Sequence, residues 1–238
     1  MMRNSDGYLV MSDSVERDLE TLKPGAPHRR VPHPFYDQFD RGRHTRESAR
    51  AALGLSGDVA LFFGYVRHYK GLDTLLTAWK RVRADRPGAT LLVAGEFYEN
   101  PDRYAALALA AGGVRILNRY IGDDEVEALF RATDVTVLPY RAGTQSGVTH
   151  VAYALGSPVI ATNVGGITET VQEGETGLTC APEDPDALAR VLVRFFTERL
   201  GARMAAPIAA LKAQHSWGAL ARSTVDLVGE LRPGRGWA

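Results

Sequence analysis

The chain has 238 residues, enough for one large domain or for one domain with an added piece. Hydrophobic residues make up 45% and charged residues 24%, which is typical of an ordinary globular protein and excludes wholesale disorder. Lysine plus arginine and aspartate plus glutamate both number 28, so the net charge of zero provides no overall field for binding nucleic acid or an anionic membrane.

The single cysteine, Cys180, cannot form a disulfide within the chain or a cysteine-based metal site. The histidines lack the spacing of metal ligands. The sequence has no apolar run long enough for a membrane span, and residues 1–10 lack the features of a signal peptide. We therefore expect a cytoplasmic protein without a bound metal.

The first predicted elements are a strand over residues 8–11 and a helix that begins at Ser12 or Ser14 and carries apolar residues on one face up to Leu22. A strand and a helix cannot bury their apolar faces alone. Prolines crowd residues 23–27 and 31–34, and proline cannot donate to a central strand ladder, so we interpret this stretch as a connector.

Short apolar runs then alternate with helical patterns, which is typical of a doubly wound parallel sheet. The predicted strands cover residues 59–63, 90–94, 114–117, 134–138, 158–161 and 177–180. A last amphipathic helix is predicted at residues 217–231. The fold prediction is a Rossmann-like α/β sheet, with unpaired apolar faces left at residues 8–22 and 217–231.

In open α/β sheets, ligands bind beyond the carboxyl ends of the strands. Gly64 ends the first of the six strands, Arg67 and Lys70 follow it, and a helix begins at Gly71 or Leu72. Two cations beside a helix N-terminus favour a phosphate site. Surface cations on an ordinary loop explain the same pattern about equally well.

A second polar loop follows the predicted strand at residues 134–138 and leads into a helix that ends near Gly156. It contains Thr144, Gln145, Ser146, Gly147 and Val148. This helix start would face the same crevice, although a loop capped by Thr144 or Ser146 is the simpler interpretation. Farther along, Glu169 follows a glycine pair at a predicted helix start, where the helix dipole alone explains a carboxylate.

Several motifs occur in a fixed order: Gly64 with Lys70-Gly71, residues 138–140 (LPY), residues 156–161 (GSPVIA) and residues 164–169 (VGGITE). As a set they resemble the donor-binding domain of retaining GT-B glycosyltransferases, the group 1 or family 4 class. The resemblance covers roughly residues 8–232. It implies the C-terminal half of a GT-B fold that binds a nucleotide diphosphate sugar and transfers the sugar to an unknown acceptor.

The resemblance also implies a division of the chain. Residues 1–56 would be the remnant of an acceptor-binding domain with the connector, residues 57–200 the donor-binding domain, and residues 201–238 the C-terminal helices and tail. The rest of the acceptor-binding domain is absent from the sequence. It would have to come from a missing segment or a partner chain.

The family's paired glutamates would fall at Gly143 and Val151, so the chain resembles a form of the family that lacks them. The resemblance assigns Arg67 and Lys70 to catalysis. Together with Gly64 and residues 144–148, they would bind the diphosphate and the sugar.

Asn118, Arg119 and Tyr120 lie in the region that usually holds the nucleotide base. The resemblance implies no cofactor besides the substrate, which would be a UDP- or GDP-linked sugar.

Two alternatives stay open. The chain could be a non-catalytic sugar-nucleotide-binding module, or one half of a split enzyme whose acceptor-binding half is another chain. A sugar-nucleotide epimerase is a weaker alternative, because the acidic or basic catalytic groups that it needs are not evident in the sequence.

Overall fold

The computed structural model describes residues 5–143 and 145–232; the predicted loop residue Thr144 lies outside them. The strands are β1 Tyr8–Val10, β2 His28–Arg30, β3 Val59–Phe63, β4 Thr90–Ala94, β5 Val114–Leu117, β6 Val135–Leu138, β7 Val159–Thr162 and β8 Gly177–Cys180. The α-helices are α1 Asp13–Leu22, α2 Arg46–Leu53, α3 Leu72–Asp85, α4 Pro101–Ala111, α5 Asp123–Ala132, α6 Gly147–Ala154, α7 Pro185–Thr197, α8 Leu200–Gln214 and α9 Trp217–Leu231. Short 3₁₀ helices are η2 Asp37–Phe39, η3 His68–Lys70 and η4 Gly165–Glu169.

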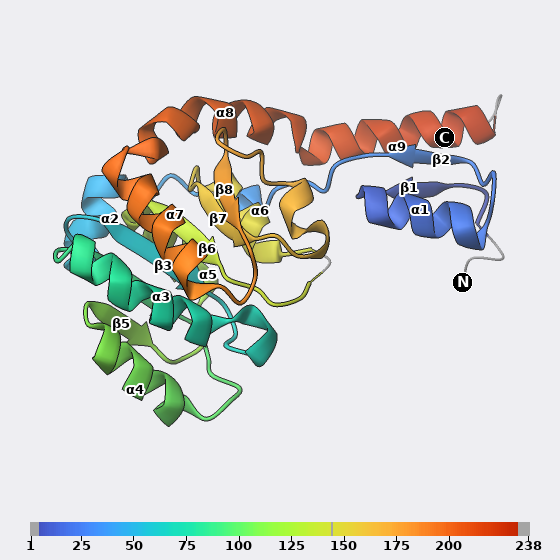
Figure 1. Cartoon of the computed structure of the whole chain (residues 1–238). Helices are drawn as coiled ribbons and strands as arrows, with labels where there is room; N and C mark the ends of the chain where they lie inside the picture. The colour runs from blue at the N-terminus through green and yellow to red at the C-terminus, as the bar shows by residue number, and fades with distance from the viewer. Residues whose placement is uncertain (1–4, 144, 233–238) are drawn as a thin grey trace. The chain divides into compact units, whose positions relative to one another are not determined.

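The chain divides into two compact units (Figure 1). The sheet unit comprises residues 36–209, and the small unit comprises residues 1–35 and 210–238. The predicted boundaries at residues 56 and 200 divide the chain by expected function, whereas the two units are defined by how compact they are. The predicted boundaries therefore stay a prediction.

The sheet unit contains a six-stranded parallel sheet in the order β5-β4-β3-β6-β7-β8, which confirms the predicted fold class. The apolar runs become strands because residues such as Leu61 and Ile160 are buried between layers of helices. Helices α3 and α7 pack side by side on one face, and α2 packs on α5 (Figure 1). The chain builds β3, β4 and β5 in one direction and then returns to place β6 on the other side of β3.

This order creates a switch point between β3 and β6. The register pairs Ala60 with Val135 across it, so the carboxyl ends of both strands reach the same edge of the sheet. The loops after β3 and β6 diverge from this point and leave a crevice, which is where such sheets bind ligands.

The small unit is built on β1 and β2, which pair in parallel with Tyr8 opposite His28. The Ser12 hydroxyl caps α1, as predicted, by accepting a hydrogen bond from the Val15 N–H at 3.3 Å. On α9, Asp226 accepts a hydrogen bond from Arg29 of β2 at 3.1 Å. Strand β2 corrects the prediction of a connector throughout this stretch. The three residues 28–30 are polar and lie between prolines, so the sequence carries no strand signal, and pairing with β1 creates the strand.

Two further local predictions differ from the structure. Helix α2 was not predicted, because it lies in the stretch interpreted as remnant and connector; Thr45 and Ser48 cap it reciprocally. Glu169 is the last residue of the short helix η4, not an early residue of an α-helix. The helix-dipole explanation for its position is therefore wrong.

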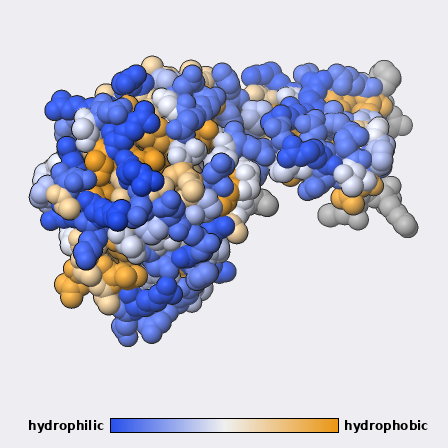
Figure 2. Space-filling view, in the orientation of Figure 1, coloured by the Kyte–Doolittle hydropathy of each residue, from blue (hydrophilic) through white to orange (hydrophobic). Residues whose placement is uncertain are grey.

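The predicted apolar faces of the small unit are buried only in part, at Leu19 of α1 and Leu227 of α9. The exposed apolar side chains of the two helices are Val15, Leu22, Trp217 and Val225. In the sheet unit, an apolar patch lies over α4, where Leu109 is exposed (Figure 2). Across residues 5–143 and 145–232, no helix is both long and apolar enough to span a membrane.

Candidate functional site

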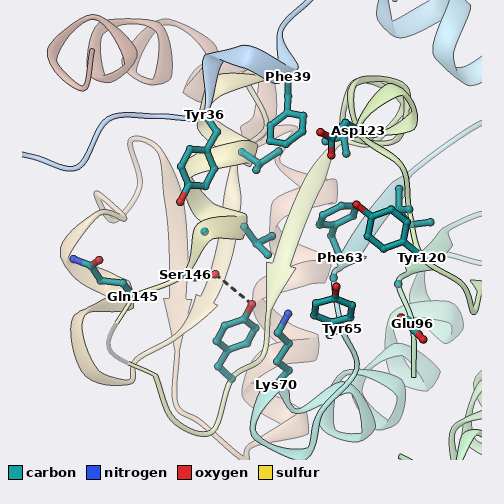
Figure 3. Close-up of a pocket in the computed structure, with 18 of the residues that line it drawn as sticks. Tyr36, Phe39, Phe63, Tyr65, Lys70, Glu96, Tyr120, Asp123, Gln145 and Ser146 are labelled. Atoms are coloured by element: carbon teal, nitrogen blue, oxygen red, sulfur yellow. Dashed lines mark hydrogen bonds between the residues drawn. The ribbon is translucent and has the colours of Figure 1, made fainter. Parts of the chain in front are cut away.

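A cavity of about 400 Å³ opens at the carboxyl edge of the sheet, around the switch point between β3 and β6 (Figure 3). One end, called the aromatic end, is formed by Phe63, Tyr65 and Tyr120, and the middle holds Lys70 (Figure 3). The described residues that line it are Tyr36, Phe39, Phe63, Gly64, Tyr65, Tyr69, Lys70, Gly95, Glu96, Tyr120, Ile121, Asp123, Val126, Tyr140, Gln145, Ser146, Gly147, Val148 and Val151.

Lys70 is the central cation of this cavity. Its side chain projects from η3 into the cavity beside Tyr65 (Figure 3). The residue is only 8% exposed, and among the described residues its ammonium has no carboxylate within ion-pair distance. The Lys70 Nζ lies over the ring of Tyr140, 5.7 Å from its centre. Burial, with a further effect of the Arg67 charge, lowers the pKa of Lys70 to about 8.

Two glycines make room for this lysine. Gly64 has φ +92°, and a Cβ there would stand 2.9 Å from the Lys70 Nζ. Gly71 has φ +66°, and a Cβ there would stand 2.0 Å from the Pro139 carbonyl oxygen. Left-handed backbone and close packing both require glycine at position 71. The turn that carries Lys70 is thus pressed directly against the end of β6.

Arg141 fixes the same turn from the β6 side. Its side chain donates to the His68 carbonyl oxygen at 2.6 Å and to the buried Asp73 carboxylate at 2.8 Å. Its backbone N–H donates to the Tyr69 carbonyl oxygen at 2.7 Å. These bonds hold η3 in place and thereby position Lys70, although Arg141 itself does not line the cavity.

Helix α6 begins at Gly147 on the opposite side of the cavity from the aromatic end (Figure 3). The first N–H groups of a helix have no acceptor within it and carry partial positive charge. Ser146 occupies the N-cap position, but its hydroxyl makes no capping bond and instead lies 3.2 Å from the Tyr140 hydroxyl. The simple capping interpretation therefore fails for Ser146, and the first two residues of α6, Gly147 and Val148, line the cavity.

The other predicted loop residues differ in position. Gly147 and Val148 line the cavity. Gln145 also lines it, but its side chain points away from Lys70 (Figure 3). The structure therefore brings Gly64, Lys70 and residues 145–148 together around one space.

Arg67 does not belong to the described lining of this cavity. It is exposed, and its guanidinium lies 4.9 Å from the centre of the Tyr98 ring. Its charge nevertheless contributes to the lowered pKa of Lys70. In this conformation Arg67 contributes charge near Lys70 but does not line the cavity.

Only one of the three residues predicted for the base region lines the cavity. Tyr120 forms part of the aromatic end. The Asn118 side-chain oxygen accepts from the Phe97 N–H at 3.1 Å, and Arg119 donates to Glu125 at 2.7 Å. Both side chains are thus engaged in local structure.

Sequence reasoning missed several lining residues. Tyr36 and Phe39 lie in the stretch interpreted as a connector, where no local pattern marks them. Glu96 follows Gly95 directly after β4, so the rule that selected Gly64 after β3 would have found it. Asp123, in the first turn of α5, adds a second carboxylate, which lies beside Phe39 (Figure 3).

The described residues contain no group of three or more histidine, cysteine, aspartate or glutamate side chains arranged to hold a metal ion. What the cavity offers is one buried cation, the start of α6, an aromatic end and two exposed carboxylates, Glu96 and Asp123. This arrangement suits an anion in the middle and a planar ring with donor groups at the aromatic end.

Comparison with known proteins gives matches to enzymes that transfer sugars. D-inositol 3-phosphate glycosyltransferase of Streptomyces scabiei is 33% identical over 213 residues, which are 83% of this chain and 47% of that protein. Sucrose-phosphate synthase from Thermosynechococcus elongatus is 26% identical with a TM-score of 0.78, covering 96% of this chain and 59% of that one.

Anabaena Alr3699/HepE, solved in complex with UDP-glucose, shares the fold with a TM-score of 0.76 at 16% identity, over 96% of this chain and 65% of that one. The chain spans about half the length of the curated relatives that it matches. The family model described as glycosyl transferases group 1 matches residues 57–198, from just before β3 to just after α7. The chain belongs to the group 1 glycosyltransferases.

Proposed function

We propose that this chain is the donor-binding half of a retaining, family 4 glycosyltransferase and that its cavity binds a nucleotide diphosphate sugar. The observation that carries the proposal is Lys70, a buried cation without a carboxylate partner among the described residues, opposite the start of α6. A buried unpaired charge is costly, so its retention at a helix N-terminus favours an anionic ligand.

The diphosphate would lie between Lys70 and α6, with the nucleoside toward Tyr120 and the sugar toward residues 145–147. In glycosyl transfer, negative charge develops on the diphosphate as the bond to the sugar breaks. Lys70 and the positive end of α6 would stabilise that charge in the transition state more than in the ground state, which accelerates the reaction. Because these protein groups supply positive charge, we propose a reaction that needs no metal ion.

The structure supports the predicted catalytic roles of Lys70 and Arg67 to different extents. Lys70 is well placed for a direct role. Arg67 would have to leave the Tyr98 ring to reach the diphosphate, so we propose that it acts mainly through its charge. The donor would be UDP- or GDP-linked, and we propose a cytoplasmic location because the lone Cys180 is typical of a reducing compartment.

Isothermal titration calorimetry with UDP, GDP, ADP and their sugars tests the proposal. We expect one nucleotide diphosphate to bind and the Lys70→Met variant to lose at least tenfold in affinity, because it removes a charged contact worth about 1.5–3 kcal/mol. Lys80→Met is the matched control, since Lys80 is an exposed lysine on α3. Equal affinity in wild type and Lys70→Met would refute the proposed site.

A second function is favoured by one feature, the presence of Gly143 and Val151 where the resemblance places paired glutamates. The chain would then bind the sugar nucleotide without catalysing transfer, or would need a separate acceptor-binding chain. Incubation of the purified chain with the bound sugar nucleotide and candidate acceptors separates the two functions. Turnover by the isolated chain would refute the binding-only function.

A further inference from the structure

Tyr36 reaches the cavity from outside the sheet and its loops. It is the first residue of the sheet unit and precedes η2. Its half-buried side chain lines the cavity (Figure 3), close to Gly147, the first residue of α6. A Cβ at Gly147 would stand 3.4 Å from the Tyr36 ring and 3.8 Å from its hydroxyl oxygen. The phenol therefore lies directly beside the start of α6.

The segment that carries Tyr36 is firmly attached to the sheet unit. The Asp40 carboxylate accepts a hydrogen bond from Arg131 of α5 at 2.6 Å. Three residues farther, the Arg43 N–H donates to the fully buried Glu127 carboxylate of α5 at 3.0 Å. On α6, His150 packs its ring 5.8 Å from that of Tyr36, centre to centre. These contacts hold the phenol in place before any ligand binds, so little conformational entropy would be lost on binding.

Lys70 and Tyr36 lie on different sides of the same space. Lys70 enters from η3, close to Gly64, whereas Tyr36 enters from the far side of α6 (Figure 3). In Figure 3, Lys70 lies below and between Tyr36 on the left and Tyr120 on the right. A nucleotide whose base occupies the aromatic end would thus place its first phosphate near Lys70 and its second nearer to the start of α6 and Tyr36.

We propose that Tyr36 is a ligand-binding residue of the donor site and that its phenolic hydroxyl donates a hydrogen bond to the second phosphate of the nucleotide diphosphate. The inference rests on the proposed function. Its physical basis is that a phenol can donate to a phosphate oxygen without adding charge, and a bond to a charged acceptor is among the stronger hydrogen bonds. Tyr36 would thereby distinguish a diphosphate from a monophosphate, which Lys70 alone would not do.

The test compares the wild-type chain with the Tyr36→Phe, Lys70→Met and Tyr8→Phe variants by calorimetry. The ligands are UDP, UMP, GDP and GMP. Tyr36→Phe keeps the ring that packs near His150 and removes only the hydroxyl. Tyr8→Phe is the matched control, because Tyr8 is also half-buried but belongs to the small unit. Thermal melting without ligand confirms that each variant is folded.

We expect Tyr36→Phe to weaken binding of the preferred diphosphate about tenfold or more and to change monophosphate affinity less than about twofold. Lys70→Met should weaken both ligands, and Tyr8→Phe neither. Equal diphosphate affinity in wild type and Tyr36→Phe, with Lys70→Met impaired, would overturn the Tyr36 inference and leave the proposed function standing. A wild type that binds neither UDP nor GDP would overturn both. An equal loss for diphosphate and monophosphate in Tyr36→Phe would also overturn the inference.

Discussion

Replacing Lys70 by methionine tests whether the buried cation is kept for binding at the expense of stability. Methionine has a similar length and is apolar, so it fills the same space without a charge to desolvate. We expect Lys70→Met to be more stable than the wild type at pH 7, although it binds the nucleotide less well. Most substitutions of a buried residue lower stability, so this expectation has an unusual sign.

The magnitude follows from the lowered pKa of Lys70. A decrease from 10.5 in the unfolded chain to about 8 in the folded one, at about 1.4 kcal/mol for each pKa unit, corresponds to roughly 3 kcal/mol of destabilisation. Because the folded-state pKa is the lower one, the unfolded state binds more protons between pH 8 and 10.5. The wild type therefore gains stability as the pH rises through this window, and below about pH 8 the full penalty remains.

Urea unfolding followed by circular dichroism at pH 7, 8.5 and 10.5 measures the effect. Lys70→Met should exceed the wild type by about 1–3 kcal/mol at pH 7, and the difference should shrink toward zero near pH 10.5. The exposed Lys80→Met control should stay within about 0.5 kcal/mol of the wild type throughout. A Lys70→Met variant that is less stable at pH 7, or a difference that does not change with pH, would refute the reasoning.

Two further substitutions test the packing around the site, and an alkylation experiment tests the burial of Cys180. Gly71→Ala should lower the free energy of unfolding by about 3 kcal/mol or more, because its Cβ would meet a carbonyl oxygen at 2.0 Å. The control Gly54→Ala has the same left-handed backbone but nothing within 4 Å, so it should lose only about 1 kcal/mol. Similar melting temperatures for the two variants would contradict this. Arg141→Met should lower the free energy of unfolding by about 2–3 kcal/mol, and it should weaken nucleotide binding because the η3 turn is displaced. Thermal melting and calorimetry measure the two effects. Effects no larger than those of Arg190→Met, at an exposed arginine, would contradict this. Burial, and to a smaller extent nearby carboxylates, raises the pKa of Cys180 to about 11. Iodoacetamide should therefore alkylate Cys180 in the native protein at pH 8 about 100-fold more slowly than it alkylates free cysteine. A rate like that of free cysteine would contradict the raised pKa.

The strand cores and the cation at the β3 end were accessible from the sequence because they depend on local patterns. Apolar runs of four or five residues bounded by helical patterns define buried parallel strands, and all six appear in the sheet. Gly64 and Lys70 were found because ligands bind where parallel strands end. Neither inference needed a contact between distant residues.

The location of Arg67 shows where local reasoning stops. Arg67 and Lys70 lie three residues apart in one turn, and their spacing gives both the same claim on a phosphate. The structure buries Lys70 in the cavity and leaves Arg67 exposed against the Tyr98 ring. That difference depends on the loop after β4, which supplies Tyr98, and no feature near Arg67 in the sequence indicates it.

Strand β2 and the aromatic residues of the connector were decided in the same way. His28–Arg30 becomes a strand only because β1 offers it a partner, and Tyr36 and Phe39 become part of the site only because α5 and α6 hold their segment over the cavity. The sequence by itself thus determined the sheet, its family motifs and the cation that follows β3, since these follow from short-range periodicity and from a general rule about strand ends. Which side chains meet around that cation was decided by the tertiary structure, because segments distant in the sequence are brought together only when the layers pack.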